Sequence, residues 1–359
     1  MLKDSAPKTK PQRYLRWGFL YNSDMHPKNE KLHQNLESGK PSVVLHNEPK
    51  LSEHEIDDDL NRMRTEFIPH IQDFVTEHDL FKHEAEVGIE FAHTGVSSVI
   101  AIIDTPAGKW VLKIPRNERH TVGEGEFFQV WEKAGVTVPQ IIETGELNDS
   151  PYTLMEYIDA PTLDTGYSHE ELIARGVFVE IGKALRLMHS ESADGYGFVI
   201  DGEPEFETAQ EWLEGYDIKR RLDYIDEYKL LEGIEDELDK ALEVIKQHSE
   251  NSDSTYCHDD FGTANIFATD PITIFDAQPR FNSRYYDLGK IKFLKVALGG
   301  SDESLTQLLE GYFGDVDCNN AVLNAYTLLF FVYKCPYWKK TGKDKELEIV
   351  KNYFRQNQI

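Results

Sequence analysis

The chain has 359 residues and a formal net charge of −26 at pH 7, from 64 acidic side chains against 38 lysines and arginines. Nucleic-acid binding needs clustered lysine and arginine, so this charge argues against a nucleic-acid partner and suits a cationic ligand better. A charge that serves solubility alone is the alternative. The length allows a large core, and we expect two lobes rather than one compact unit.

Three further features exclude other classes of protein. The longest apolar stretch, near residues 328–333, is far too short to cross a bilayer. Residues 1–8 lack the apolar core of a signal peptide. Cys257, Cys318 and Cys335 lack metal-like spacing and leave an odd one over. We therefore expect a cytoplasmic protein with no membrane partner, disulfide framework or zinc site, and no protein partner is evident.

The first fifty residues are expected to lie outside the core as an N-terminal extension. They are polar, lean basic and show no sustained helical or strand period. One aromatic cluster stands out, formed by Tyr14, Trp17, Phe19 and Tyr21. The segment is interpreted either as a disordered tail or as an arm that docks these aromatic side chains on a neighbouring surface.

A helix and a sheet follow the extension. Residues from Ser52 to about Leu80 have a helical pattern, as one helix or as two divided at Pro69. Residues 84–91, 99–103 and 110–114 predict three antiparallel strands, and residues 141–146 and 152–157 predict two more. The first half of the chain is therefore expected to build an antiparallel sheet behind a leading helix.

Lys113 is the one lysine within an apolar strand of this sheet. Burying an unpaired ammonium group is costly, so we expect a partner. A helix beginning near Thr121 carries Glu124 and Glu126, and either carboxylate is a candidate. The alternative is a lysine whose head reaches water at the sheet edge.

The second half of the chain is predicted to be mostly helical. Residues 168–171, Ser-His-Glu-Glu, form a capping box. The helix that they start would place one apolar stripe in the core. An acid-rich helical region covers residues 211–248, and three helices near residues 305–313, 321–333 and 345–356 end the chain. The stripe consists of Ile173, Val177, Ile181, Leu185 and Met188.

Residues 255–290 carry the chemistry. Two short apolar runs, 266–268 and 272–275, flank a Thr-Asp-Pro sequence that predicts a tight hairpin. A turn centred on Asp270 and Pro271 would set Asn265 opposite Asp276, with α-carbons about 5 Å apart. One carboxylate and one amide oxygen suit a hard divalent cation that keeps some waters and bridges phosphates. Asp260, on the loop entering the hairpin, is placed to orient a substrate hydroxyl and take its proton.

The order His258, Asp260, Asn265 and then a strand ending in Asp276 resembles the catalytic-loop and metal-loop pair of kinase-fold phosphotransferases. No Phe-Gly follows Asp276, and the closing Tyr-Asp-Leu at Asp287 is similar to that of the aminoglycoside phosphotransferase family. Residues 260–265 are also similar to the loop of hygromycin phosphotransferases. The resemblance covers about residues 84–354.

The resemblance implies an α+β, bilobal protein-kinase-like fold. Residues 51–157 would form the small antiparallel-sheet lobe with its leading helix, and residues 158–359 the larger helical lobe with the acceptor site. ATP or GTP would bind between them. Lys113 would contact the α and β phosphates, and Glu124 would hold its ammonium group. Glu124 is preferred over Glu126 because, in the family, the distance from this glutamate to a later Val-Pro pair matches that from Glu124 to Val138-Pro139.

Other site residues follow from the same resemblance. Gly95, Ser97 and Ser98 lie in the loop that would cover the phosphates, and backbone groups of Glu156 and Ile158 would meet the adenine edge. These are weak signals on their own, since the first segment alone would pass for a hairpin turn and the second for a strand ending in a Pro turn.

On the acceptor side, Asn265 and Asp276 would hold Mg²⁺, and Asp260 would position the acceptor hydroxyl and accept its proton. His258 is interpreted as bracing the loop rather than as a base, and Asp287 as a second brace. The acid-rich helices of residues 211–248 would form a wall of the acceptor pocket.

The expected acceptor is an aminoglycoside or aminocyclitol antibiotic, because an acidic chain favours a cationic substrate, and antibiotic resistance would then be the role. A macrolide, a sugar and a metabolite amino alcohol are the alternatives. A rival from another class is a nucleotide-binding pseudokinase with a regulatory role, favoured by Asp259 beside Asp260 and by the sparse phosphate loop, and opposed by the filled catalytic positions. A protein kinase is disfavoured because no activation segment separates Asp276 from Asp287.

Overall fold

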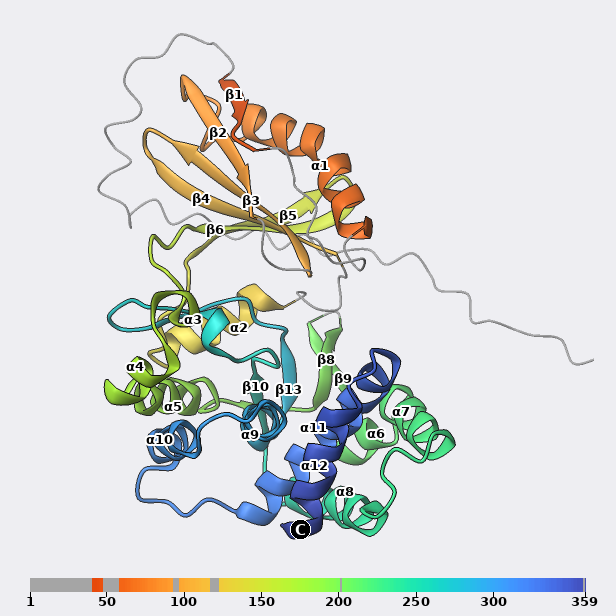
Figure 1. The fold of residues 1–359 in the computed structure, drawn as a ribbon. Helices are drawn as coiled ribbons and strands as arrows, with labels where there is room; N and C mark the ends of the chain where they lie inside the picture. The colour runs from red at the N-terminus through yellow and green to blue at the C-terminus, as the bar shows by residue number, and fades with distance from the viewer. Residues whose placement is uncertain (1–40, 48–57, 93–96, 117–122, 201, 358) are drawn as a thin grey trace, which may run out of the picture.

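The computed structural model describes residues 41–47, 58–92, 97–116, 123–200, 202–357 and 359, and these build a small and a large lobe (Figure 1). The expected bilobal α+β fold is confirmed. A six-stranded sheet with one covering helix forms the small lobe, and helices around a five-stranded sheet form the large lobe. Among the described residues, no helix combines the length and the hydropathy that a membrane span requires.

The small-lobe sheet has the strand order β1-β2-β3-β4-β6-β5. Helix α1 (Asp58–Glu77) runs unbroken through Pro69 and packs Phe67, Ile71 and Val75 into the same core as the strands. The antiparallel strands are those that the alternating pattern predicted. Their bounds are β2 (Glu86–Phe91), β3 (Ser98–Thr105), β4 (Gly108–Pro115), β5 (Ile141–Leu147) and β6 (Ser150–Glu156).

One edge strand comes from the N-terminal region, where no strand was predicted. Strand β1 (Ser42–Leu45) pairs parallel with β2, from Ser42 beside Glu86 to Leu45 beside Ile89. Four residues are too few to show a period, and the neighbouring strand fixes their conformation. The aromatic cluster of residues 14–21 lies outside the described residues.

Helix α2 (Glu124–Lys133) packs on the large lobe, although the sequence assigned it to the small one. Phe127, Phe128 and Trp131 belong to the large-lobe core. The Phe127 ring lies 4.8 Å from that of Tyr256, and the Trp131 indole donates a hydrogen bond to the Tyr256 carbonyl at 3.3 Å. The apolar side of this helix therefore fits the larger core.

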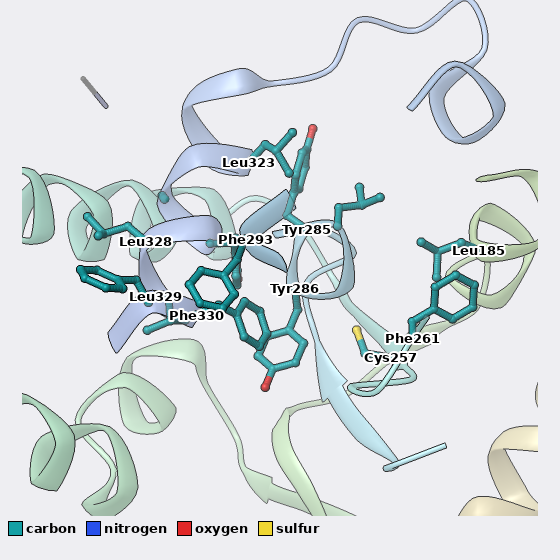
Figure 2. Packing of buried hydrophobic residues seen from close by; sticks show 14 of the residues in the cluster. Leu185, Cys257, Phe261, Tyr285, Tyr286, Phe293, Leu323, Leu328, Leu329 and Phe330 are labelled. Carbon is teal, nitrogen blue, oxygen red and sulfur yellow. The ribbon is translucent and has the colours of Figure 1, made fainter. Parts of the chain in front are cut away.

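The large-lobe sheet has the order β7-β10-β13-β8-β9. Its core is continuous with the surrounding helices, and Figure 2 shows the packing of buried side chains from α9 and α11. Here the rings of Tyr286 on α9 and Phe330 on α11 have their centroids 4.7 Å apart. The strands are β7 (Ser192–Ala193), β8 (Tyr196–Ile200), β9 (Glu203–Phe206), β10 (Ser254–Cys257) and β13 (Arg280–Asn282). The helices are α3 (Leu163–Gly166), α4 (His169–Ala174), α5 (Val177–Met188), α6 (Ala209–Leu213), α7 (Tyr216–Glu227), α8 (Glu235–Ser249), α9 (Tyr285–Leu298), α10 (Asp302–Phe313), α11 (Asn320–Lys340) and α12 (Asp344–Gln356).

The structure divides two of the predicted helical segments into shorter helices. The capping box at Ser168 and Glu171 is present, but the helix that it starts ends at Ala174, and Gly176 takes φ = 68° before α5 begins. Glycine adopts this left-handed backbone without the strain of a side chain, so it interrupts the stripe. Residues 211–248 form three helices, most of α6, α7 and most of α8, rather than one region.

Helices α9 and α11 approach each other closely at Gly289. A Cβ atom at this position would lie 2.5 Å from the Tyr326 Cβ, so only glycine fits. This contact fixes the position of α9 relative to α11. Asp287 lies in the first turn of α9, and Lys290 directly follows Gly289. Both side chains reach the candidate site.

Candidate active site

The hairpin of residues 265–276 has a different register from the predicted one. Strands β11 (Ile266–Phe267) and β12 (Thr273–Ile274) pair Ile266 with Ile274, and the Phe275 amide donates to the Asn265 carbonyl at 3.1 Å. Asn265 therefore lies opposite Phe275, not Asp276. The loop has five residues and is centred on Asp270 alone, which shifts the pairing by one position.

The His258 imidazole braces the loop that carries Asp260. Its Nε2 donates to the Phe275 carbonyl at 2.9 Å, and its Nδ1 accepts the Asp260 amide proton at 3.2 Å. The ring is fully buried and stacks on Trp131 at 5.8 Å. Burial lowers the pKa of His258, although nearby Asp287 opposes this. Both nitrogens of a neutral ring are occupied, which supports a bracing role rather than that of a base.

Asp287 holds the same loop from the first turn of α9. Its carboxylate accepts the amides of His258 and Asp259 at 2.8 and 2.9 Å, and it accepts from the His189 Nε2 at 3.1 Å. His189 Nδ1 in turn lies 2.9 Å from the Tyr312 hydroxyl. The buried Asp287 carboxylate thus fixes two consecutive backbone groups next to Asp260.

His189, Cys257 and Asp287 place their ligand atoms within 4.8 Å of one another. Their hydrogen bonds favour a structural brace over a metal centre. Burial and the Asp287 charge raise the pKa of the Cys257 thiol well above its usual value, so the thiolate that binds metal is disfavoured. Both carboxylate oxygens of Asp287 already accept hydrogen bonds, from two backbone amides and from His189.

Asp259, the acid next to Asp260, is neutralised by two cations. Arg280 Nε donates to the Asp259 Oδ2 at 2.8 Å, and both side chains are only 8% exposed. Lys290 Nζ contacts the Asp259 carbonyl and lies 3.2 Å from the Asp260 Oδ1. Burial opposes the charge on Lys290, but Asp259 and Asp260 outweigh it and raise its pKa. The pair of adjacent acids therefore carries little net charge.

Asn265 points its amide back to the loop. Its Nδ2 donates to the Asp260 carbonyl at 2.7 Å and reaches the Asp260 Oδ2 at 3.3 Å. The amide oxygen is on the opposite branch of the side chain and offers the hard donor that Mg²⁺ prefers. The Asp260 carboxylate is thus held between Asn265 and Lys290, and its side chain is 45% exposed.

Lys113 joins the two lobes through one ammonium group. Its Nζ lies 2.8 and 2.9 Å from the Glu124 carboxylate oxygens and 2.8 Å from the Asp276 Oδ1. Glu126, the other candidate partner, is exposed. Burial opposes the charge on Lys113, but the carboxylates of Glu124 and Asp276 raise its pKa. Burial likewise opposes the charge on Asp276, but the Lys113 ammonium group lowers the pKa of that carboxyl. Glu124 is 1% and Asp276 37% exposed, so Asp276 is the open side of the cluster.

The remaining predicted residues are less informative. Gly95 lies outside the described residues. The Ser97 carbonyl accepts the Arg116 amide at 2.8 Å, and the buried Ser98 Oγ has no hydrogen-bond partner among the described residues. The Glu156 amide donates to the Gln140 carbonyl at 2.9 Å, so it is engaged within the protein, and Ile158 follows at the exit from β6. Among the described residues, no hydrogen bond or ion pair connects Ser97, Ser98, Glu156 or Ile158 to the loop that carries Asp260.

Arg280, Lys290 and His189 were not identified from the sequence. Lys290 follows Asp287 by three residues, and a helix predicted from Tyr285 would have placed both on one face. Arg280 stands alone between Pro279 and Phe281, a pattern with no functional signature. His189 is separated by 98 residues from its partner Asp287, so no local signal connects them.

Comparisons with known proteins identify a family and two groups of related proteins. The family model described as "Phosphotransferase enzyme family" matches residues 88–313. A probable ketoamine kinase of Staphylococcus aureus (strain NCTC 8325 / PS 47) is 22% identical over 205 residues, which cover 52% of this chain and 67% of the relative.

Two solved structures share the fold. The aminoglycoside phosphotransferase APH(4)-Ia superimposes with a TM-score of 0.57 at 14% identity, covering 79% of this chain and 96% of that one. A putative fructosamine-3-kinase from Haemophilus somnus 129PT gives 0.52 at 14% identity, with coverage of 76% and 92%.

Proposed function

Because the chain belongs to the phosphotransferase enzyme family, whose model matches residues 88–313, we propose that it transfers the γ-phosphoryl group of ATP or GTP to a hydroxyl of a small molecule. One observation carries the proposal. Asp276 contacts the buried Lys113–Glu124 pair that joins the two lobes, and His258 ties the loop that carries Asp260 to Phe275, the residue before Asp276.

On the nucleotide side, Lys113 would bind the α and β phosphates while Glu124 holds its ammonium group in place. The structure of a thermostable mutant of APH(4)-Ia is a ternary complex with AMP-PNP and hygromycin B. It superimposes with a TM-score of 0.56 at 15% identity, covering 76% of this chain and 94% of that one. The shared fold supports a nucleotide between the lobes. Ser97 and Ser98 stand at the start of β3, and with Gly95 they would contact phosphate oxygens. Glu156 and Ile158 would meet the adenine through backbone groups, with the Glu156 carbonyl in place of its engaged amide.

The donor set of Asn265 and Asp276 fits Mg²⁺, one hard amide oxygen and one carboxylate. Bound there, the ion would neutralise charge that develops on the phosphoryl group. Asp276 keeps a low pKa because Lys113 outweighs the effect of burial, so its carboxylate is ionised at neutral pH. An ionised oxygen donor is what a divalent cation requires.

On the acceptor side, Asp260 would orient the acceptor hydroxyl and take its proton. The acceptor oxygen forms the new bond to the γ-phosphorus as the bond to the β-γ bridging oxygen breaks, and the nucleoside diphosphate leaves. Lys290 and Asn265 hold the Asp260 carboxylate, so its contribution is mainly orientation. The braces at His258 and Asp287 keep this loop in position.

The expected aminoglycoside or aminocyclitol acceptor rests on the overall charge and on the family. The named relatives are an aminoglycoside phosphotransferase, a probable ketoamine kinase and a putative fructosamine-3-kinase. These names fit an antibiotic and a sugar-derived amine equally. The acceptor class is therefore argued from the residues beside Asp260, in the next subsection.

The test is nucleotide consumption with Mg²⁺ against aminoglycosides, aminocyclitols, macrolides, sugars, sugar acids, ketoamines and amino alcohols, with the product identified by mass spectrometry. Asp260→Asn should lower kcat by at least about 10²-fold, the usual contribution of a positioned base, while nucleotide affinity stays unchanged. Asp270→Asn, a turn residue of the same hairpin, is the matched control. Undiminished turnover in Asp260→Asn contradicts the assigned role.

A further inference from the structure

Lys334 on α11 has no assigned role and an unusual environment. It is half-buried, and no hydrogen bond or ion pair connects it to any described residue. Burial lowers the pKa of its ammonium group, the charges of Lys290 and Arg221 lower it further, and Asp260 and Asp259 oppose them. Lys334 is therefore an unpaired cation within electrostatic range of the proposed catalytic carboxylate.

Its neighbours on α11 locate it between two other cations. Phe330, one helical turn earlier, lies under the Lys290 ammonium group at 6.0 Å. Tyr333, the preceding residue, lies under the Arg221 guanidinium at 4.8 Å, and its carbonyl accepts from Arg221 Nη1 at 2.9 Å. Helices α7, α9 and α11 thus place Lys334 near both Arg221 and Lys290, with Asp260 within electrostatic range of Lys334.

The acids nearby are already matched. Asp259 pairs with Arg280 at 2.8 Å, and Asp260 pairs with Lys290 at 3.2 Å. On α7, Asp217 pairs with Arg221 at 3.2 Å. Lys334 is left as the surplus positive charge, in a chain whose net charge is −26. Removing an ammonium group from water without a partner costs free energy, which a bound anion would recover.

We propose that Lys334, supported by Arg221, binds an anionic group of the acceptor, a carboxylate or a phosphate, while Asp260 receives the acceptor hydroxyl. The inference rests on the proposed phosphotransferase function and narrows its substrate class to hydroxylated anions. A polycationic aminoglycoside would meet the repulsion of the unpaired Lys334 ammonium group here. This proposal differs from the cationic acceptor expected from the sequence, because net charge is a sum over the whole surface and not a property of the residues beside Asp260.

The first test compares acceptors matched in shape and different in charge: D-gluconate, D-glucose and D-glucosamine, and the ketoamines of glycine and of ethanolamine. The carboxylate-bearing member of each set should have the highest kcat/KM. Lys334→Gln should raise its KM roughly 10- to 100-fold, the loss of a charge-assisted contact, with little change in the KM for ATP. Lys334→Arg should restore most of the affinity.

Lys340→Gln is the control, an exposed lysine six residues further along the same helix. A neutral or amine-bearing acceptor used as well as its carboxylate counterpart overturns the proposal. So does a Lys334→Gln protein whose KM rises equally for charged and neutral acceptors, because this pattern indicates a structural defect.

The second test does not need turnover. Pyridoxal 5′-phosphate, an anionic aldehyde, is reacted with the protein in the presence of Mg-ADP, reduced with borohydride and located by peptide mapping. We expect Lys334 to be modified at least about tenfold faster than Lys340, and pyridoxal without its phosphate to lose this preference. Equal rates at the two lysines overturn the anion site. Loss of nucleotide binding together with an absence of turnover counts instead against the phosphotransferase function, so the two failures are distinguishable.

Discussion

The nucleotide side and the acceptor side of the proposed active site distribute charge in opposite ways. On the nucleotide side, Glu124 and Asp276 share the single ammonium group of Lys113, so the cluster has an excess negative charge. On the acceptor side, each acid has its own cation, and Lys334 is left over as positive. The first arrangement suits a metal ion and the second an anion. Local pairing, rather than the net charge of −26, indicates what each side binds.

The largest expected effect comes from breaking the acceptor side at Arg280. Arg280→Gln leaves the buried Asp259 without its nearest cation and should lower the free energy of unfolding by about 3–5 kcal/mol. Denaturant unfolding measures it. Arg186→Gln, an exposed arginine on α5, should change stability by less than about 0.5 kcal/mol.

The double variant Arg280→Gln with Asp259→Asn separates the pair from its surroundings. Removing both charges should recover part of the loss, because no unpaired carboxylate is then buried. A single Arg280→Gln variant as stable as the Arg186→Gln control would show that Lys290 alone compensates Asp259, and the acceptor side would then lack a balanced pair.

An intermediate effect is expected on the nucleotide side, from a comparison of two neighbouring acids. Glu124→Gln should raise the KM for Mg-ATP roughly 10- to 100-fold, because Lys113 loses a bidentate charged partner. Glu126 lies two residues further along the same helix and is exposed, so Glu126→Gln should leave this KM unchanged. Steady-state kinetics at saturating acceptor provide the measurement, with circular dichroism to confirm folding. Equal values for the two variants would remove Glu124 from the nucleotide site.

The smallest effect concerns His258, which lies between the two sides. Its pKa is lowered in the folded state, so between that value and the ordinary value of about 6.5 the unfolded chain binds the additional proton. The free energy of unfolding should therefore fall by about 1 kcal/mol as the pH drops from 7.5 to 5.5. Asp276 and Asp287 also have lowered pKa values, but they lose their contribution only in more acidic solution.

Denaturant unfolding at both pH values checks this in wild type and in His258→Gln. The variant should be less stable at pH 7.5 and should show a smaller difference between the two pH values. His248, whose pKa is lowered by burial and by Arg284, remains in both proteins and accounts for a residual slope. An unchanged slope in His258→Gln would mean that the ring is not the neutral brace described above.

Short-range signals in the sequence were sufficient for most elements. They left Glu124 and Glu126 open as partners of Lys113, and the family resemblance favoured Glu124, which the structure shows as the partner. The strands around Lys113 alternate clearly, and the capping box at Ser168 is local chemistry. The prediction was less accurate where a single position decides the outcome. A five-residue loop instead of an even one moved Asn265 from Asp276 to Phe275, and Gly176 divided a helix that an apolar stripe alone would continue.

The cations beside Asp260 were not predictable for a different reason. Arg221, Lys290 and Lys334 lie on three helices and are separated by 44 or more residues along the chain, so no spacing rule connects them. The acidic composition even pointed the other way. Long-range packing, such as the close approach of α9 and α11 at Gly289, decides which charged side chains lie beside Asp260.

The packing of α2 on the large lobe has a consequence for motion. Lys113 moves with the small-lobe sheet, while its partner Glu124 is carried by a helix whose aromatic side chains sit in the large-lobe core. A hinge opening between the lobes would therefore separate the lysine from its acid, and closure would restore the pair. Movement of α2 away from the large lobe would require Trp131 to leave its stack on His258. The stack therefore favours a change in the angle between the lobes that parts the Lys113–Glu124 pair over one that carries α2 with the small lobe.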